Sequence, residues 1–391
     1  MNKYILFFVF LLCGFFSVSA ETKAADPTVP DSFQRFDADS RLAIDYSDLN
    51  SLLGTVVLDT GMSTRKKAAP THAQTGTRMR ATVNRATVNE GNRFLFEIFD
   101  NNEENQQVLR EIRDRLENLP TSTPLENYSR DEQLAYWLNL YNITILDEIV
   151  KIYPEHDLKE LLVGKKSILP MKLLMVAGIP LSLNDIQFTI LKNNYENNPL
   201  IIYGLFQGII GGPNIRKSAY SGTYVYGDLV DNAVEFINSN RGTASKNKRV
   251  FRVSSLYKRN EVFFNDSDSD LTRHLLRYLD GDEHDELQAA TSIKPDINDW
   301  TITDLYGSFR DVGASFANSN AALTGSVPNS QAGKLSSNGS AISRYHPALA
   351  AQLDELNKKR AQSEKEVGVV TVEELGQISD DTNTAENDGE K

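Results

Sequence analysis

Cysteine is almost absent from this sequence of 391 residues, and the only one is Cys13. A single thiol excludes an intrachain disulfide, and it excludes a zinc or iron–sulfur site built from several thiolates. Basic residues are also too few for a nucleic-acid coat, because 41 lysines and arginines face 53 acidic residues and leave a net charge of −12. Binding along a phosphate backbone needs the opposite sign, so we expect no nucleic-acid partner.

Histidine is scarce, and its positions follow no metal-binding spacing. The five histidines are His72, His156, His274, His284 and His346, and none of them forms an HExxH motif. The alternating acids from Asp266 start like a calcium loop, but Leu271 and Arg277 stand where that loop needs glycine and glutamate. No Gly-x-Ser-x-Gly nucleophile elbow is present. We therefore predict no metal site and no cofactor, and we nominate no catalytic residue.

The sequence has one long apolar run near its start, residues 5–16, which follows Lys3 and precedes small residues. This arrangement is typical of a secretory signal peptide over residues 1–20, and the run is short for a membrane span. Cleavage before Glu21 would also remove Cys13. We expect a mature chain without cysteine or membrane span, located in the periplasm or outside the cell; an uncleaved anchor is the alternative.

Composition divides the rest of the chain into five parts. These are a leader with a helix and a basic segment over 21–100, a core domain over 101–310, a flexible linker over 311–345, a helix over 346–366 and an acidic disordered tail over 367–391. The basic segment (residues 62–93) and the acidic tail could each contact a protein partner. The alternative for the basic segment is a solvated loop.

Hydrophobic periodicity predicts an α+β fold, mainly helical around a small sheet. Helices are expected over 42–58, 103–119, 129–153, 182–192, 226–240 and 271–279. The helix over 129–153 begins with a capping box from Ser129 to Glu132 and is apolar on nearly every side, so it should be buried. The expected strands are a hairpin over 172–183, a buried strand over 200–206 and short strands over 249–253 and 261–264, with residues 300–309 closing the core.

Asn139 and Asn142 lie three residues apart on the buried helix and therefore share one face. Their amides could hold a ligand or a loop. The alternative is that they bond backbone carbonyls inside the core, because buried amides need hydrogen-bond partners. We expect this second arrangement.

Glycines recur between residues 204 and 214, and such a stretch could form a phosphate-binding loop. The stretch lacks the Gly-Lys-Ser/Thr ending of such a loop. We expect these glycines to serve tight turns and close approach of backbone segments.

Three stretches resemble the uncharacterised family of bacteria and plants called domain of unknown function 547. Residues 131–142 (DEQLAYWLNLYN) resemble its helix motif AFWINLYNA, residues 181–186 (LSLNDI) are similar to its LSLxxIEHxILR, and residues 198–213 take the place of its DPRxHFALxCxxxSCPPL. The ending NDWT at 298–301 resembles YDWSLN. The resemblance covers residues 128–305 and implies the fold of that family.

The chain departs from this family pattern where the pattern has reactive groups. Gln187 and Phe188 replace Glu and His, Ile202 replaces His, Gln207 replaces Cys, and Gly211 and Gly212 replace Ser and Cys. A thiol nucleophile with a base and an orienting group would need that lost set. The resemblance therefore argues against such chemistry in this chain.

We predict an exported, non-catalytic binding or interaction protein with a degenerate enzyme-like site. The candidate binding residues are Asn139, Asn142, Gln187, Tyr203, Gln207 and Arg216. The ligand would be a small molecule or an envelope component. The alternative is an envelope or extracellular hydrolase with rebuilt carboxylate or serine chemistry, which two buried acids about 5–10 Å apart in one cleft would favour.

Overall fold

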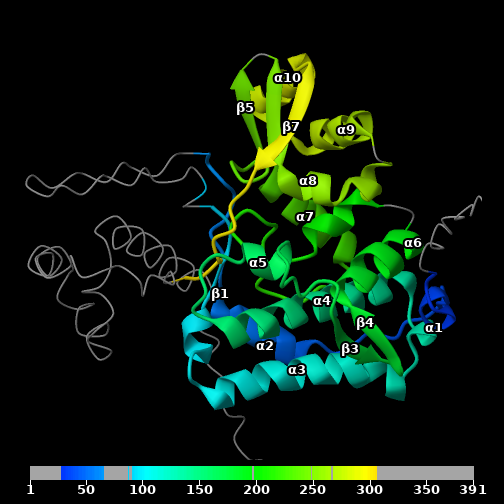
Figure 1. Ribbon diagram of the computed structural model, residues 1–391. Helices are drawn as coiled ribbons and strands as arrows, with labels where there is room; N and C mark the ends of the chain where they lie inside the picture. The colour runs from blue at the N-terminus through cyan, green and yellow to red at the C-terminus, as the bar shows by residue number, and fades with distance from the viewer. Residues whose placement is uncertain are drawn as a thin grey trace, which may run out of the picture.

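The computed structural model describes residues 28–65, 87, 90–195, 198–247, 249–265 and 267–305 (Figure 1). The predicted signal peptide, linker, C-terminal helix and acidic tail lie outside these residues, as does most of the basic segment. In the part of the chain that the structure describes, no helix has both the length and the apolar character needed to cross a bilayer.

Most secondary-structure elements of the described residues are helices. The α-helices are α1 (Asp31–Gln34), α2 (Ser47–Val56), α3 (Glu103–Ser122), α4 (Arg130–Ile152), α5 (Lys159–Leu162), α6 (Lys192–Asn194), α7 (Val225–Ile237), α8 (Ser255–Arg259), α9 (Asp268–Tyr278) and α10 (Gly281–Ala289). A π-helix spans Asp185–Leu191, and 3₁₀ turns span Phe96–Phe99, Leu125–Asn127, Pro199–Tyr203 and Glu261–Phe264. The strands are β1 (Val57–Leu58), β2 (Arg93–Phe94), β3 (Lys172–Val176), β4 (Ile179–Ser182), β5 (Thr243–Asn247), β6 (Val250–Ser254) and β7 (Ser292–Ile297).

Helix α4 forms the centre of the molecule, between α3 on one side and α7 on the other (Figure 1). The predicted buried helix over 129–153 is thereby confirmed. Its capping box is only half formed: the Ser129 hydroxyl accepts from the Glu132 amide at 3.2 Å. The Glu132 carboxylate instead accepts from the amides of Ile44 and Gly222, at 3.1 and 2.9 Å. This buried acid therefore fixes two distant loops against the start of α4.

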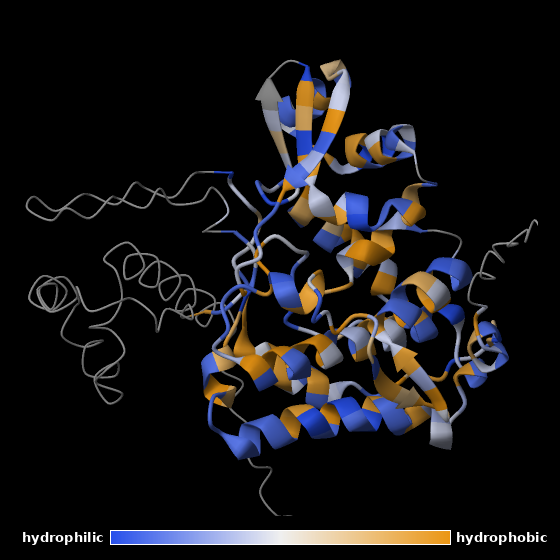
Figure 2. Cartoon of the chain, in the orientation of Figure 1, coloured by the Kyte–Doolittle hydropathy of each residue, from blue (hydrophilic) through white to orange (hydrophobic). Residues whose placement is uncertain are grey.

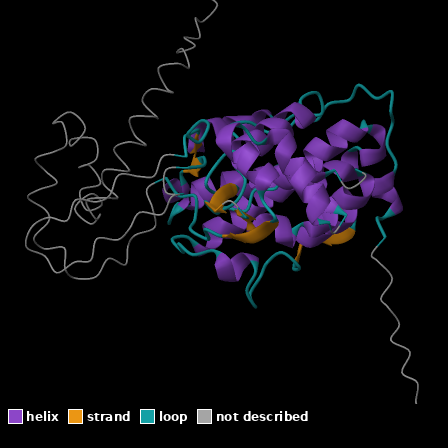
Figure 3. Cartoon of the chain, turned by 90° about the horizontal axis from the view of Figure 1, so that it is seen from above, coloured by secondary structure: helices purple, strands orange, loops and turns teal. Residues whose placement is uncertain are grey.

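Within the described residues, the strands form three small sheets rather than the single one expected. β1 pairs with β2 and β3 pairs with β4, both antiparallel, while β6 lies between antiparallel β5 and parallel β7. The three-stranded sheet and α10 lie at the opposite end of the molecule from α3 (Figure 1). From above, helices make up most of the body (Figure 3). The α+β, mainly helical class and the 172–183 hairpin are confirmed.

Two predicted strands are wrong. The stretch 200–206 starts with the 3₁₀ turn Pro199–Tyr203, in which Pro199 fixes the first turn and the Asn198 side chain accepts from the Leu200 amide at 3.0 Å. A continuous apolar run indicates burial but does not separate strand from helix. The stretch 261–264 is likewise the 3₁₀ turn Glu261–Phe264.

Helix α3 also runs past its predicted end, through Pro120 to Ser122. A proline inside a helix leaves the carbonyl four residues earlier without its amide partner. That carbonyl belongs to Leu116 and accepts from the Tyr136 hydroxyl of α4 at 3.0 Å. The α4 side chain thus replaces the missing hydrogen bond. Hydrophobic and hydrophilic residues alternate along α3 (Figure 2), and Leu109 and Leu116 are among those that it buries.

Residues 299–305 close the core as an extended segment. The Phe94 amide donates to the Thr303 carbonyl at 2.8 Å, and the Leu305 amide donates back to Phe94 at 3.0 Å. The Thr303 amide also donates to the Gly208 carbonyl at 2.8 Å. The last described residues are therefore joined to both the first strands and the glycine-rich segment.

Candidate functional site

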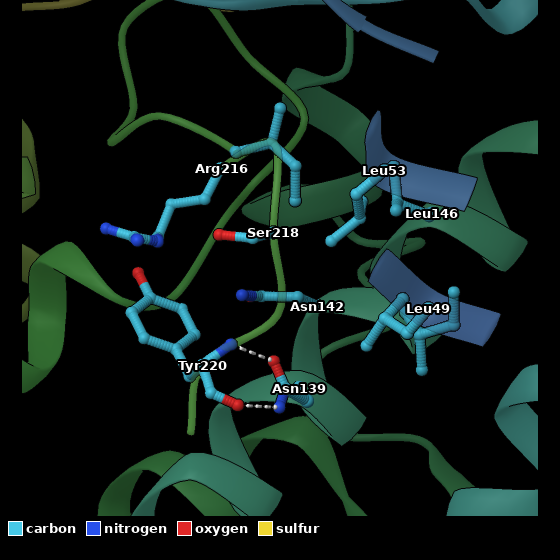
Figure 4. Close-up of a pocket in the computed structure, with 10 residues that line it drawn as sticks. Leu49, Leu53, Asn139, Asn142, Leu146, Arg216, Ser218 and Tyr220 are labelled. Carbon is cyan, nitrogen blue, oxygen red and sulfur yellow. Dashed lines mark hydrogen bonds between the residues drawn. The ribbon is translucent and has the colours of Figure 1, made fainter. Parts of the chain in front are cut away.

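Asn139 and Asn142 hold backbone segments against α4 (Figure 4). The Asn139 amide group donates to the Tyr220 carbonyl at 2.8 Å, and its oxygen accepts from the Tyr220 amide at 2.9 Å. Asn142 does the same between the Gly204 carbonyl and the Phe206 amide, both at 2.9 Å. Both side chains thus bond the backbone, as the second interpretation of their sequence pattern expects.

A small cavity lies between these amides and Arg216 (Figure 4). Its volume is about 10 Å³, enough for roughly one water molecule. The Arg216 guanidinium forms an ion pair with Asp228 at 2.7 Å and lies 5.3 Å from the centre of the Tyr220 ring. Three of the six predicted binding residues therefore meet here, around a space too small for a metabolite.

Gln187 and Gln207 meet at the end of α8. The Gln207 oxygen accepts from the Arg259 guanidinium at 2.9 Å, and the Gln187 amide group donates to the side-chain oxygen of Asn260. The Gln187 oxygen accepts from the Tyr141 hydroxyl at 3.5 Å. We call these five residues the α8 site.

Two unusual backbone features position the glutamines. Gln187 lies in the π-helix Asp185–Leu191, and such helices are rare and often occur at functional sites. Gln207 is followed by Gly208, whose φ of +73° favours glycine. A Cβ on Gly208 would lie 2.1 Å from the Ile149 side chain of α4. The chain can therefore turn against α4 directly after Gln207 only because glycine stands there.

Tyr203 reaches α8 by another contact. Its hydroxyl donates to the Tyr257 hydroxyl at 3.3 Å and lies 2.9 Å from Nε2 of His274. The His274 ring also stacks on the Tyr203 ring. Burial, together with the nearby Arg277 charge, lowers the pKa of His274 to about 4. Burial also raises the pKa of Tyr203. Both groups are therefore neutral near pH 7 and form a core contact rather than an acid–base pair.

The α8 site combines one cation with neutral hydrogen-bonding groups. Burial lowers the pKa of Arg259 to about 10, so it stays charged at neutral pH. Burial raises the pKa of Tyr141, although the Arg259 charge opposes this, so its phenol stays protonated. The remaining three members are carboxamides. These five side chains can bind and orient a ligand, but none exchanges a proton near neutral pH.

The other positions that depart from the family pattern have separate surroundings. The Phe188 ring packs 6.4 Å from that of Phe263, just after α8. A Cβ on Gly212 would lie 3.6 Å from the Cβ of Gln207. Ile202 is buried in the core.

Gly211 has a structural reason of its own. Its amide donates to the Asp299 carbonyl at 2.8 Å, and a Cβ there would lie 2.6 Å from that same oxygen. A side chain at this position would push the closing segment away. The expected use of these glycines for close backbone approach is confirmed here.

A second buried polar cluster surrounds Arg241, which the sequence did not indicate. Arg241 forms a two-pronged ion pair with Glu235 and donates to the Gly212 carbonyl at 2.9 Å. Glu90 lies 4.0 Å from its Nε atom. Burial raises the pKa of Glu235, while Arg241 opposes the shift. Among the described residues, no group of three or more His, Cys, Asp or Glu side chains is placed to hold a metal.

A larger cavity of about 280 Å³ lies beside α8, α9 and β7. Its lining includes Tyr257, Phe264, Leu271, Ile293, Pro295 and Lys258. The Lys258 ammonium is paired with the Glu261 carboxylate, so its charge is already neutralised. Arg259, the next residue, belongs to the α8 site instead.

The fold and the site define an α+β protein with a buried central helix and a site of amides and one guanidinium. The family described as "Protein of unknown function, DUF547" matches residues 125–237, which confirms the predicted resemblance. This stretch includes α4, Gln187 and Gln207, whereas Arg259 follows it. Neither the curated proteins nor the solved structures that were compared match the chain.

Sequence reasoning found the glutamines of the α8 site but missed its other members. Tyr141 stands between Asn139 and Asn142 in the helix motif, so the motif itself was a usable signal. Arg259 offered no such signal, because its contact with Gln207 joins residues 52 positions apart.

Proposed function

We propose that the chain is an exported protein that binds a ligand at the α8 site without catalysing a reaction. Export rests on the signal-like residues 1–20 and on the cysteine-free sequence that follows them. The binding role rests on the composition and order of the α8 site. A contact of the basic segment or the acidic tail with a protein partner is a separate proposal for the same chain.

One observation supports the non-catalytic interpretation. Gln187 and Gln207 stand where the resembling family pattern has glutamate and cysteine, and a carboxamide serves neither as base nor as nucleophile. Yet both side chains are more than nine-tenths buried and hydrogen-bonded to the consecutive residues Arg259 and Asn260. The site therefore keeps a defined polar geometry after the reactive groups have been replaced, which fits binding better than turnover.

A hydrolase with rebuilt carboxylate chemistry is less well supported. It would need acids free to exchange protons in a cleft. Among the buried acids of the described residues, Glu235 and Glu90 both lie against Arg241, and Glu235 is held by it at both oxygens. Their arrangement resembles a structural ion-pair network.

The test compares turnover by the chain from Glu21 onward with that of its Gln187→Ala and Gln207→Ala variants. Chromogenic esters, anilides, glycosides and phosphoesters are offered as substrates. We expect no turnover that depends on either glutamine. The exposed Gln107 of α3 supplies the matched control, Gln107→Ala. Turnover that Gln207→Ala abolishes, in a variant with unchanged melting temperature and an unaffected control, would overturn the proposal.

A further inference from the structure

We infer that the α8 site binds an organic carboxylate, with Arg259 and Gln207 as the groups that receive it. This inference rests on the proposed function and names its ligand class. It comes from a mismatch of charge inside the described part of the chain.

Arg259 is a mostly buried cation whose partners are all neutral. Its guanidinium donates to the Ser255 hydroxyl at 2.6 Å and to the Gln207 oxygen at 2.9 Å. Its plane lies over the Trp300 ring, 4.9 Å from the centroid. Among the described residues, no carboxylate lies within ion-pair distance of it. A buried charge without a counter-charge is costly, so a fold that keeps one needs a reason.

Within the described residues, three other partly or fully buried arginines each have a carboxylate partner. Arg113 pairs with Asp147 at 2.5 Å, Arg216 pairs with Asp228, and Arg241 pairs with Glu235. Burial lowers the pKa of Arg259, and the one described group that raises it is Tyr141. The Tyr141 phenol is itself neutral at pH 7, so it does not supply a counter-charge. The counter-charge at Arg259 therefore comes from a group outside the described residues, and we take it to be a bound ligand.

The unused groups of the site are donors. A guanidinium has five N–H groups, and the two hydrogen bonds of Arg259 leave three. Gln207 uses its oxygen, and its NH₂ group has no hydrogen bond to the described residues. A ligand group that only accepts hydrogen bonds, and that carries negative charge, satisfies both sets.

Charge selects a carboxylate over a phosphate monoester. A carboxylate carries one negative charge, which one guanidinium neutralises, and its two oxygens match the planar fork of arginine. A phosphate monoester carries about −1.5 to −2 at pH 7 and would need a further cation. The neighbouring Lys258 is occupied by Glu261.

The first experiment follows the melting temperature of the chain from Glu21 onward in added anions at constant ionic strength. Sodium acetate, succinate and trialanine with a free carboxyl terminus are compared with amidated trialanine and inorganic phosphate. We expect a saturable rise with free carboxylates only, because a ligand that binds the folded state raises its stability. A response to acetate and succinate indicates a small organic acid, whereas a response to trialanine alone indicates a peptide terminus. No response to any carboxylate, or an equal one to phosphate, overturns the inference.

The second experiment measures affinity by calorimetry in three variants. Arg259→Gln should weaken carboxylate binding at least about tenfold, as expected for the loss of a charged hydrogen bond. Arg259→Lys keeps the charge but loses the fork, and it should also bind more weakly. Lys258→Gln makes the same charge change one residue away and should stay within about twofold of the wild type. If Lys258→Gln weakens binding as much, the anion lies elsewhere and the inference fails.

Stability separates a binding role from a structural one. Without ligand, Arg259→Gln removes an uncompensated charge and should melt within about 2 °C of the wild type. Arg241→Gln leaves the buried Glu235 carboxylate without its ion-pair partner, and this variant should melt clearly lower. A similar large loss in both would make Arg259 a structural residue and overturn the inference. Turnover at the site would overturn the proposed function alone, and absence of carboxylate binding would overturn this inference alone.

Discussion

Gln207 and Gly212 are placed as the two halves of a disulfide would be: a Cβ on Gly212 would lie 3.6 Å from the Cβ of Gln207. Cβ atoms joined by a disulfide are usually 3.5–4.5 Å apart. These are also the two positions at which the resembling family pattern has cysteines. The two backbone positions are therefore close enough in this chain to be joined by a disulfide.

We predict that the double variant Gln207→Cys with Gly212→Cys forms this bond on oxidation. The bond closes a very short loop, so the oxidised form should exceed the reduced form by about 2 kcal/mol in free energy of unfolding. Thiol titration and urea unfolding of the chain from Glu21 onward measure both effects, with no native cysteine to interfere. Each single variant is the control and should keep one titratable thiol. A folded double variant whose two thiols stay free after oxidation would contradict the prediction.

Asn139→Leu should destabilise the protein by about 3 kcal/mol. The substitution leaves the backbone amide and carbonyl of Tyr220 buried without partners, and each such group costs about 1–3 kcal/mol. Urea unfolding gives the value. Asn118→Leu, at an exposed position of α3, is the matched control and should change stability little. Unchanged stability in Asn139→Leu would show that this amide is not structural.

His274 should make the fold sensitive to acid. Burial lowers its pKa to about 4, below the roughly 6.5 of an unfolded histidine. Between these values the unfolded state binds more protons, so stability falls as the pH falls. We expect His274 to account for a loss of about 3 kcal/mol between about pH 7 and pH 4. His274→Phe keeps an aromatic ring and should remove this loss in urea unfolding, while His284→Phe at an exposed position should not. Parallel pH curves for wild type and His274→Phe would refute it.

The exported chain should begin at Glu21. When the full sequence is made in a bacterial host, peptide sequencing of the periplasmic or secreted fraction should find this start. Ala20→Arg places a large charged residue at the cleavage site and should leave the uncleaved form with the membrane. Ser40→Arg, well beyond the site, should be processed normally. An uncleaved wild-type chain would favour the anchor alternative.

The elements that sequence predicted well carry local signals. Ser129 caps α4, and the unbroken apolar character of that helix indicated its burial. The 3₁₀ turn Pro199–Tyr203 was missed because its apolar residues carry no period that separates strand from helix. The end of α3 was predicted too early at Pro120, because the hydrogen bond that this proline removes is replaced by Tyr136 of another helix.

Residues of the candidate site could be predicted from the sequence only where they fall in the family motif. Gln187 and Gln207 were found because they depart from a family pattern. Their partner Arg259 ends a five-residue helix whose short sequence has no amphipathic period, and Asn260 is the residue that follows it. Asn139 and Asn142 illustrate the opposite limit: their shared face was readable, but whether they hold ligand or backbone depended on loops far along the chain.

The segment 299–305 also sets the order in which this protein can fold. Its hydrogen bonds to Phe94 and Gly208 join parts of the chain that are made long before it. The core therefore cannot close until nearly the whole domain has been synthesised. Such non-local closure slows folding, because the entropy of a long loop is lost before the contacts form.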